Sequence, residues 1–425
     1  MRRAASLFLA AGLVFSGPAF AGVPAGHGGV YEDLNLFNEA FSRVQQDAVE
    51  KMGAEHLVRA AITGMLSSID PNGEYLDKAA LSAATGQGDT VGLVVTMRRS
   101  AVRVIAPRDG SPAAAAGIEP GDIILTIGRE LASAMTLRQV ESRLQGPPGS
   151  TVVLRLERSG VDHPIKVVLK RATFHLRTVR ARLLGDLGYI RIAGFDAGTL
   201  PALSKAIDGL RQKSGNKLQG FILDLRNNPG GEFEAAVQVA DAFLGKGVIT
   251  EIKSPRGAPK PIRASGGDLA QGLPIVVLID GGTADEAELV AAALEDNHRA
   301  VLVGTRSFGE DAIETLIPLK GGGAIRLTTA RFLTPRGQEI AGKGLTPEVT
   351  VKPVKLVALK EGLLIREVDL PGALKNPDHQ QAKAKTPGAG PALPARAEVN
   401  PTDEQLVRAA DILHALAITK RSGQG

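Results

Sequence analysis

Two short stretches that each follow a glycine-containing turn include five acidic residues whose types and spacing could do chemistry. In chain order they are Asp285, Glu286, Glu288, Glu310 and Glu314. Carboxylates that lie together can bind a hard divalent cation, or can act as an acid–base pair when one of them is held protonated. The same acids in a first helical turn would only stabilise the helix dipole. Which interpretation holds depends on where the fold places the two stretches.

The composition excludes several other chemistries. The 425 residues contain no cysteine, which removes disulfides, thiolate metal sites, cysteine nucleophiles and a lipoprotein anchor. Fifty basic and 45 acidic residues give a net charge of +5, and the basic residues are scattered along the chain. We therefore expect no nucleic-acid partner. The sequence indicates no cofactor.

The first 21 residues have the pattern of an export signal. Arg2 and Arg3 precede an apolar run over 4–15, and Ala19-Phe20-Ala21 is a small-x-small cleavage site. The alternative, a membrane anchor, fits less well because a span needs about 20 apolar residues. The sequence predicts a signal peptide over 1–21, cleavage after Ala21 and a periplasmic mature protein of charge +5 − 2 = +3.

Two different patterns follow the signal. Residues 29–87 carry apolar residues at intervals of three and four, which predicts an N-terminal helical region. Residues 88–172 contain five β-rich runs separated by turn residues, with one helix predicted over 136–144. This pattern is typical of a small barrel-like sheet.

The remaining chain alternates strands and helices over 173–355, which predicts an α/β core. Strands are expected over 189–192, 220–225, 275–279 and 300–303, with helices over 200–212, 233–244 and 284–295. Residues 375–400 have the composition of a flexible linker, and 401–419 are predicted as a final helix. The fold class is therefore α/β and multi-domain.

Several motifs in this order resemble those of the carboxyl-terminal processing peptidases, also called tail-specific proteases. The resemblance runs from about Phe37 to Lys352, and it implies an α/β peptidase core with an inserted PDZ domain. The motifs are GMLSSIDP (64–71), AAAAGIEPGDIIL (113–125), DLRNNPGG (224–231), VGTRSFG (303–309), LTTAR (327–331) and KGLTP (343–347).

The resemblance also assigns positions to the family's catalytic residues. That family uses a serine nucleophile, a lysine base 25 residues later and a glutamine four residues beyond the lysine. The matching positions here are Asp285, Glu310 and Glu314, with 310 − 285 = 25 and 314 − 310 = 4. A serine needs a base to become a nucleophile, and neither group is present at these positions. The resemblance therefore implies a non-catalytic homologue with no intact catalytic set.

Other uses of this region remain open. An active serine-type endopeptidase would need unorthodox residues, and Thr283 is one candidate, although Thr283 and Glu286 also fit a helix-capping pair. A divalent cation could be held by Asp285, Glu310 and Glu314. Otherwise these acids need a proton, water or a basic partner such as Arg306 or Arg331.

The resemblance implies two peptide-binding elements. Gly230 and Gly231 match the oxyanion turn, although they could serve only to turn the chain. In the PDZ domain, a carboxylate-binding loop and an apolar pocket are expected at Gly92, Leu93, Val94, Val95, Val140 and Leu144, unless these residues are ordinary core. The expected partners are protein C-termini or extended peptides, an active paralogous protease, or further copies of the chain in a homo-oligomer.

Overall fold

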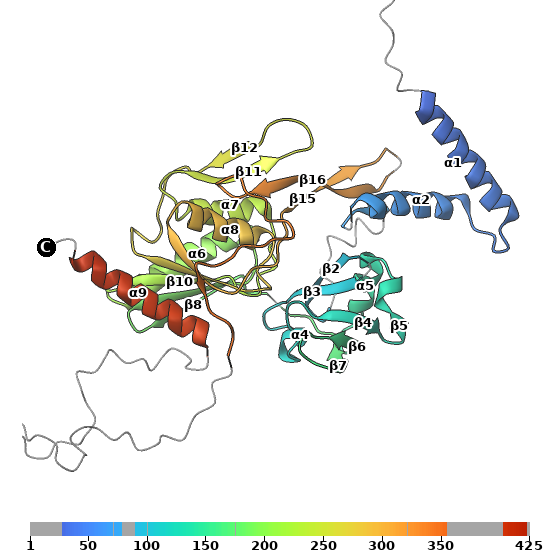
Figure 1. The fold of residues 1–425 in the computed structure, drawn as a ribbon. Coiled ribbons are helices and arrows are strands. Elements are labelled where there is room, and N and C mark those ends of the chain that lie inside the picture. Colours follow the sequence, from blue (N-terminus) through green and yellow to red (C-terminus); the bar gives the residue numbers. More distant parts are fainter. Residues whose placement is uncertain are drawn as a thin grey trace, which may run out of the picture. The chain divides into compact units, whose positions relative to one another are not determined.

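The computed structural model describes residues 28–70, 72–78, 90–99, 101–174, 176–320, 322–354 and 403–422 (Figure 1). The predicted signal peptide, over 1–21, and the predicted linker, over 375–400, lie outside these residues. Contacts divide the chain into two units, residues 1–64 and 65–425. No helix among the described residues has both the length and the apolarity needed to cross a bilayer.

The region predicted as helical over 29–87 contains two helices and a strand. The helices are α1 (Gly28–Asp47) and α2 (Ala54–Ile69). Beyond them the prediction is wrong, because β1 (Glu74–Leu76) pairs antiparallel with a strand of the core. The pairing of Glu74 with Arg326 shows why, since a distant partner decides the conformation of so short a segment.

The core contains a six-stranded sheet in the order β17-β14-β13-β10-β9-β8. All neighbours pair in parallel except β8 and β9. The strands are β8 (Val179–Leu184), β9 (Leu187–Ile192), β10 (Gly220–Asp224), β13 (Ile275–Ile279), β14 (Ala300–Gly304) and β17 (Val349–Thr350).

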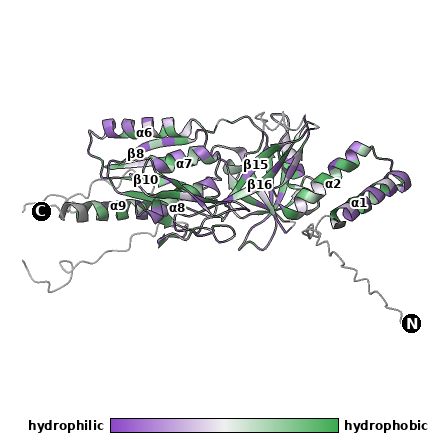
Figure 2. Cartoon of the chain, turned by 90° about the horizontal axis from the view of Figure 1, so that it is seen from above, coloured by the Kyte–Doolittle hydropathy of each residue, from purple (hydrophilic) through white to green (hydrophobic). Residues whose placement is uncertain are grey.

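Helices cover both faces of this sheet. Alternate strand residues point to opposite sides, and because the inner strands are largely apolar, both faces are buried. Val277 packs with α6 (Thr199–Lys213), α7 (Phe233–Asp241) and α8 (Glu286–Asp296), whereas Val276 packs with α9 (Glu404–Ser422). Figure 1 shows α9 on the opposite side from these three helices. Figure 2 colours α6 in alternating purple and green, as expected for a helix with one buried face.

A charged network joins the carboxyl end of the central strand β10 to α9. The Arg226 guanidinium donates to Asp224 on β10 and to the Asp403 carboxylate, at 2.6 Å and 2.9 Å. Asp403 in turn accepts from the Leu406 amide in the first turn of α9. The Asp224 carboxylate, which is almost fully buried, also accepts from the Tyr189 hydroxyl at 2.8 Å. The network therefore fixes the carboxyl end of β10, where the chain turns toward the site.

The segment expected as a PDZ domain forms its own sheet, in the order β2-β3-β4-β6-β7 with β5 beside β4. Its helices are α4 (Pro112–Ala115) and α5 (Leu137–Leu144), with a 3-10 turn over Ala132–Ala134. Its strands are β2 (Leu93–Arg98), β3 (Ala101–Pro107), β4 (Ile123–Ile127), β5 (Glu130–Leu131), β6 (Thr151–Glu157) and β7 (Ile165–Lys170). The five β-rich runs and the helix of the sequence analysis all lie in this sheet or on it.

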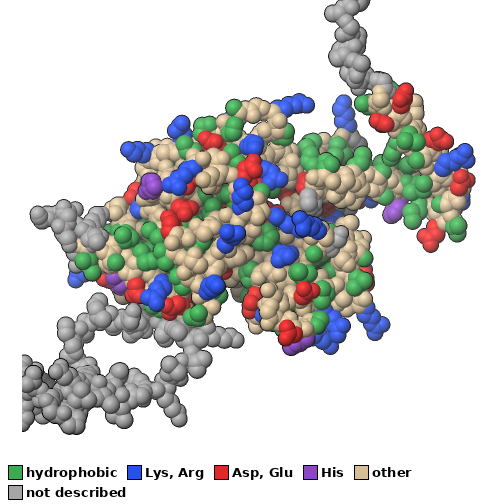
Figure 3. Space-filling model, in the orientation of Figure 1, with side chains coloured by type: hydrophobic (Ala, Val, Ile, Leu, Met, Phe, Trp, Pro, Cys, Tyr) green, Lys and Arg blue, Asp and Glu red, His purple; other side chains and the backbone are tan. Residues whose placement is uncertain are grey.

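A third sheet was not predicted. Its order is β1-β16-β11-β12, with β15 also beside β16, and its later strands are β11 (Val248–Lys253), β12 (Lys260–Arg263), β15 (Ala312–Pro318) and β16 (Ala324–Leu333). On the face shown in Figure 3, Lys and Arg side chains lie among acidic ones over several elements.

Candidate active site

The acidic stretches meet at the carboxyl edge of the parallel sheet. The segments that follow β10, β13 and β14 are joined there by backbone hydrogen bonds: the Ala284 amide donates to Asn228 and the Phe308 amide to Thr283, both at 2.9 Å. Parallel strands bring their carboxyl ends to one edge, so these loops must converge. This placement brings Asp285, Glu286, Glu288 and Glu310 into one region.

Asp285 occupies a strained position at the start of α8. Its backbone angles are φ 51° and ψ −122°, a conformation that costs a non-glycine residue about 1–3 kcal/mol. One carboxylate oxygen, Oδ1, is buried without a hydrogen-bond partner among the described residues. Burial, and then the charges of Glu286, Glu310, Glu288 and Glu314, hold the pKa of Asp285 well above its ordinary value. The site therefore favours the protonated form of Asp285.

Thr283 does not cap α8, so the predicted capping pair with Glu286 is wrong. The Thr283 hydroxyl donates to the Leu225 carbonyl and accepts from the Asp280 amide, both at 2.9 Å, and the residue is fully buried. The helix instead begins after Asp285, whose amide donates to Glu288 at 3.2 Å. The hydroxyl therefore bonds to the loop that follows β10, a contact between distant segments that the sequence pattern could not reveal.

Glu286 reaches the glycine turn that the sequence singled out. The Gly231 amide donates to Glu286 Oε2 at 2.8 Å, and only 6% of Glu286 is exposed. Burial raises the pKa of Glu286 to about 7, although hydrogen bonds from the Gly231 amide and from its own amide favour the charged form. Sequence reasoning placed Glu286 only at the start of a helix, in its cap or first turn, and therefore missed this contact.

Glu288 joins α8 to the loop after β14. Its buried carboxylate accepts from the Ser307 hydroxyl and from the Gly309 and Glu310 amides, the last two at 2.9 Å. Burial raises the pKa of Glu288 to about 7, and these hydrogen bonds oppose that rise. Glu288 therefore has a structural role that its position in a first helical turn did not indicate.

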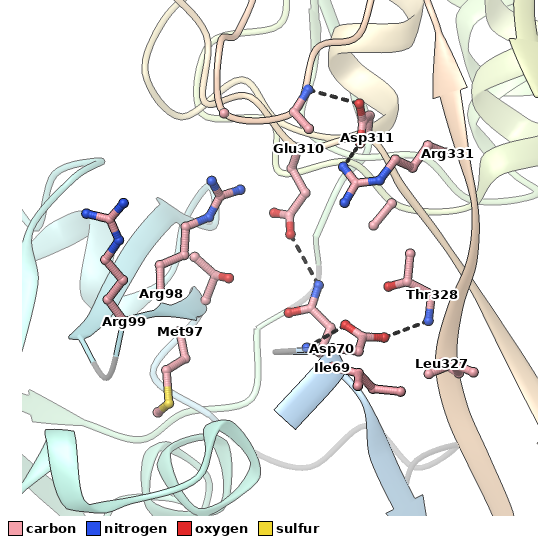
Figure 4. Close-up of a pocket in the computed structure, with 15 residues that line it drawn as sticks. Ile69, Asp70, Met97, Arg98, Arg99, Glu310, Asp311, Leu327, Thr328 and Arg331 are labelled. Carbon is pink, nitrogen blue, oxygen red and sulfur yellow. Dashed lines mark hydrogen bonds and ion pairs between the residues drawn. The ribbon is translucent and has the colours of Figure 1, made fainter. Parts of the chain in front are cut away.

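Glu310 lies at a cavity of about 680 Å³, whose lining also includes Asp70, Arg98 and Arg331. In Figure 4 the Glu310 side chain points toward the segment that carries Asp70, and its Oε1 accepts from Asn72 at 3.2 Å. Burial raises the pKa of Glu310, while Asn72 and Arg98 lower it. Neither Asn72 nor Arg98 was predicted at this site.

Glu314 lies on β15, where its nearest cation is Arg326, with 3.8 Å between Oε2 and Nε. The predicted partner Arg331 instead pairs with Asp311 at 2.9 Å. Burial raises the pKa of Glu314 and Arg326 lowers it. Arg326 was missed because its register beside β15 belongs to the unpredicted sheet.

The possible metal site is not formed. Across the described ranges, no three Asp, Glu or His side chains are arranged to hold a metal ion. Asp285, Glu310 and Glu314 influence one another's ionisation, yet Glu310 bonds to Asn72 and Glu314 lies nearest Arg326. In the described residues, the Asn72 amide beside Glu310 and the Arg326 guanidinium near Glu314 reduce the repulsion between the acids, and burial favours the protonated form of Asp285.

In the PDZ-like sheet, the expected loop lies at the start of an edge strand. Gly92 has a φ of +74°, and a Cβ there would lie 2.2 Å from Ser111 Cβ, so only glycine fits. Leu93 and Val94 are half-buried, and Val95 is 7% exposed. Val140 and Leu144 are buried in the domain core, at 0% and 2% exposure. A peptide side chain would reach these two only if α5 moved from β2.

Comparisons with known proteins agree with this architecture. A sequence profile of peptidase family S41 matches residues 186–351, and a PDZ domain profile matches 103–158. The carboxy-terminal-processing protease of Bartonella bacilliformis is 40% identical over 331 residues, which is 76% of each chain. The chain belongs to the carboxy-terminal-processing protease family.

Two further relatives extend the comparison. The carboxy-terminal processing protease CtpA of Bacillus subtilis is 32% identical over 323 residues, covering 74% of this chain and 68% of that protein. The photosystem II D1 C-terminal processing protease has a similar structure, with a TM-score of 0.65 at 30% identity over 76% of this chain and 93% of that one. The expected peptidase core with an inserted PDZ domain is thereby confirmed.

The raised pKa of Glu310 predicts a pH-dependent effect of its replacement. The folded state binds this proton more tightly than the unfolded state, so Glu310 reduces the free energy of unfolding as the pH rises above the ordinary glutamate range. Glu310→Gln keeps an acceptor for Asn72 and removes the charge. We expect its Tm to exceed that of wild type by roughly 2–4 °C at pH 8, with no gain at pH 4.5.

The matched control is Glu339→Gln. Its hydrogen bond with Lys253 lowers the pKa of Glu339, so this variant should gain nothing at pH 8. Thermal unfolding across this pH range measures both variants. An equal Tm for wild type and Glu310→Gln at every pH would contradict the interpretation.

Proposed function

We propose that this chain is an exported, non-catalytic member of its family that binds protein C-termini, alone or together with an active paralogous protease. The observation that carries the proposal is Asp285, a carboxyl at the strained start of α8. By the family resemblance, this position belongs to the serine nucleophile. The fold supports the proposal because hydrogen bonds between the loops hold this position in place, while the side chain there is a carboxyl and not a hydroxyl.

The chemistry of acyl transfer fails at two points. Asp285 has no hydroxyl that could lose a proton and attack a carbonyl, and Glu310, at the lysine position, carries no amine to accept one. The Glu310 carboxylate instead accepts from Asn72 at 3.2 Å. Restoring only one of the two groups would leave the other function missing.

An active serine-type endopeptidase would need another hydroxyl. Thr283 and Ser307 are two of the hydroxyl residues in the loops beside Asp285, and they are 0% and 5% exposed. Thr283 bonds to Leu225 and Asp280, while Ser307 donates to Glu288 and accepts from the Leu345 amide. For Thr283 and Ser307, hydrogen bonds on both sides and shielding from solvent disfavour a role as nucleophile.

A carboxyl pair acting as acid and base is disfavoured as well. Such a pair shares a proton through a hydrogen bond. Asp285 Oδ1 has no partner in the described part of the chain, and Glu310 Oε1 is bonded to Asn72.

Peptide binding is supported by the PDZ domain. β2 is an edge strand, so an extended peptide could add to it, and the backbone at Gly92 keeps a conformation suited to an amide loop. Because Val140 and Leu144 are buried, we expect modest affinity from this groove alone.

We predict that the mature protein does not cleave unfolded proteins or peptides. Wild type and Asp285→Ala should give equal and background rates in a fluorogenic peptide assay, because Asp285 supplies no nucleophile. Activity in the wild type that Asp285→Ala removes would overturn the proposal.

For the PDZ groove, we predict that peptides with apolar residues and a free C-terminus bind more tightly than the same peptides amidated. Fluorescence anisotropy with both forms measures the difference, which should be at least tenfold for one lost charged hydrogen-bonding group. Gly92→Val should abolish it, since the added side chain would collide with Ser111, and Gly160→Val is a control at an open turn with a similar φ of +81°. Equal affinity for both peptide forms would exclude carboxylate recognition.

Export is the third part of the proposal. The pattern over residues 1–21 predicts that the mature chain begins at Gly22 in the periplasm. Osmotic-shock fractionation followed by N-terminal sequencing tests this, and an uncleaved chain in the membrane fraction would support the anchor instead.

A further inference from the structure

The glycine turn at 230–231 already has a carboxylate bound to it. The Gly231 amide donates to Glu286 Oε2 at 2.8 Å. Among the described residues, no basic side chain donates a hydrogen bond to this oxygen. Glu286 is 6% exposed, so its carboxylate is largely desolvated where it makes this contact. Burying a carboxylate is costly unless hydrogen bonds replace its hydration, so the amide contact has a measurable role.

The turn is shaped to bring bare backbone close to an acceptor. A Cβ on Gly230 would lie 2.4 Å from Glu286 Oε2, and a Cβ on Gly231 would lie 2.2 Å from the Phe195 carbonyl oxygen. The Asn228 side chain accepts from the Gly230 amide at 3.0 Å, and the Phe195 amide donates to the Gly230 carbonyl at 3.2 Å. These bonds hold the turn in place whether or not Glu286 is bound to it.

Two observations describe the surroundings of the turn, and the first shows that it can be reached from solvent. Gly231 is exposed to solvent, although Gly230 is buried. Asp285 Oδ1, next to the turn, is a buried polar atom without a partner in the described chain. A Cβ on Gly230 would lie 3.0 Å from Asp285 Cβ, which places this unpartnered carboxyl beside the turn.

We propose that the Gly230–Gly231 turn is a carboxylate-binding site for the free C-terminus of a peptide, and that Glu286 blocks it as a built-in competitor. The side-chain carboxylate of Glu286 and the α-carboxylate of a peptide are the same chemical group, so both fit the Gly231 amide. A tethered competitor acts at a high effective concentration, so a free peptide displaces it poorly. The site therefore opens only when Glu286 moves away or is replaced.

This inference rests on the proposed function in one respect, namely that a bound C-terminus stays uncut. It adds to that function a second carboxylate site, separate from the PDZ groove and closed by the chain itself. Blockage by Glu286 would limit the protein to PDZ-only binding until a partner or substrate draws Glu286 off the turn.

The test uses a ligand too small to extend along the PDZ edge strand. N-acetyl-alanine carries a free carboxylate, and N-acetyl-alaninamide is its neutral match. Glu286→Ala removes the competitor, and Glu286→Asp shortens it by one methylene, so that the carboxylate no longer reaches Gly231. Glu286→Gln keeps an acceptor for the Gly231 amide. Glu234→Ala removes an exposed acid from the first turn of α7 as the control.

Thermal unfolding of the mature chain with each compound is the measurement. All proteins are measured at one concentration of N-acetyl-alanine, ten times its Kd for Glu286→Ala. At this concentration the Tm of Glu286→Ala and Glu286→Asp should rise by about 2–4 °C, and the amide should cause no rise. Wild type, Glu286→Gln and Glu234→Ala should shift by less than about a quarter of that. If Glu286→Ala does not fold, Glu286→Asp carries the comparison.

Equal shifts in all five proteins, no shift in either opened variant, or equal shifts with acid and amide would each overturn the inference. Peptide cleavage by wild type would instead overturn the proposed function and leave these shifts as they are, so the two failures are distinguishable.

Discussion

The convergence of three loops at the carboxyl edge of one parallel sheet is the constraint on which the site depends. Hydrogen bonds from Ala284 to Asn228 and from Phe308 to Thr283 fix these loops against one another. The fold therefore places the side chains at positions 285, 286 and 310 in the same small region, whatever their residue types. The scaffold determines where chemistry could take place, and the residue types determine whether it does.

Those residue types make the region a cluster of acids, whose mutual repulsion must be offset by protons or hydrogen-bond donors. Glu288 has donors from Ser307, Gly309 and Glu310, and Glu286 has the Gly231 amide. Asp285 has no such help at Oδ1, and burial favours its neutral form. A site of this kind binds protons and hydrogen-bond donors well. It offers neither the nucleophile nor the base that acyl transfer requires.

Much of the fold could be predicted because buried parallel strands are short continuous apolar runs, as in Ile275–Ile279. The third sheet escaped prediction because its strands are partly exposed and pair with distant segments, as Glu74 does with Arg326. The positions of Asp285, Glu310 and Glu314 followed from the family resemblance, whereas their hydrogen bonds did not. The Glu286–Gly231 contact joins residues 55 positions apart, and the left-handed backbone of Asp285 is a conformation that an aspartate rarely adopts.

Native mass spectrometry of the mature chain with a peptide that ends in free apolar residues tests the central claim most directly, because one spectrum reports both binding and cleavage. The account predicts a complex that contains the intact peptide, with no shorter fragments after prolonged incubation. Peptide fragments that accumulate with wild type and not with Asp285→Ala would contradict it, since they would show that this site still performs proteolysis.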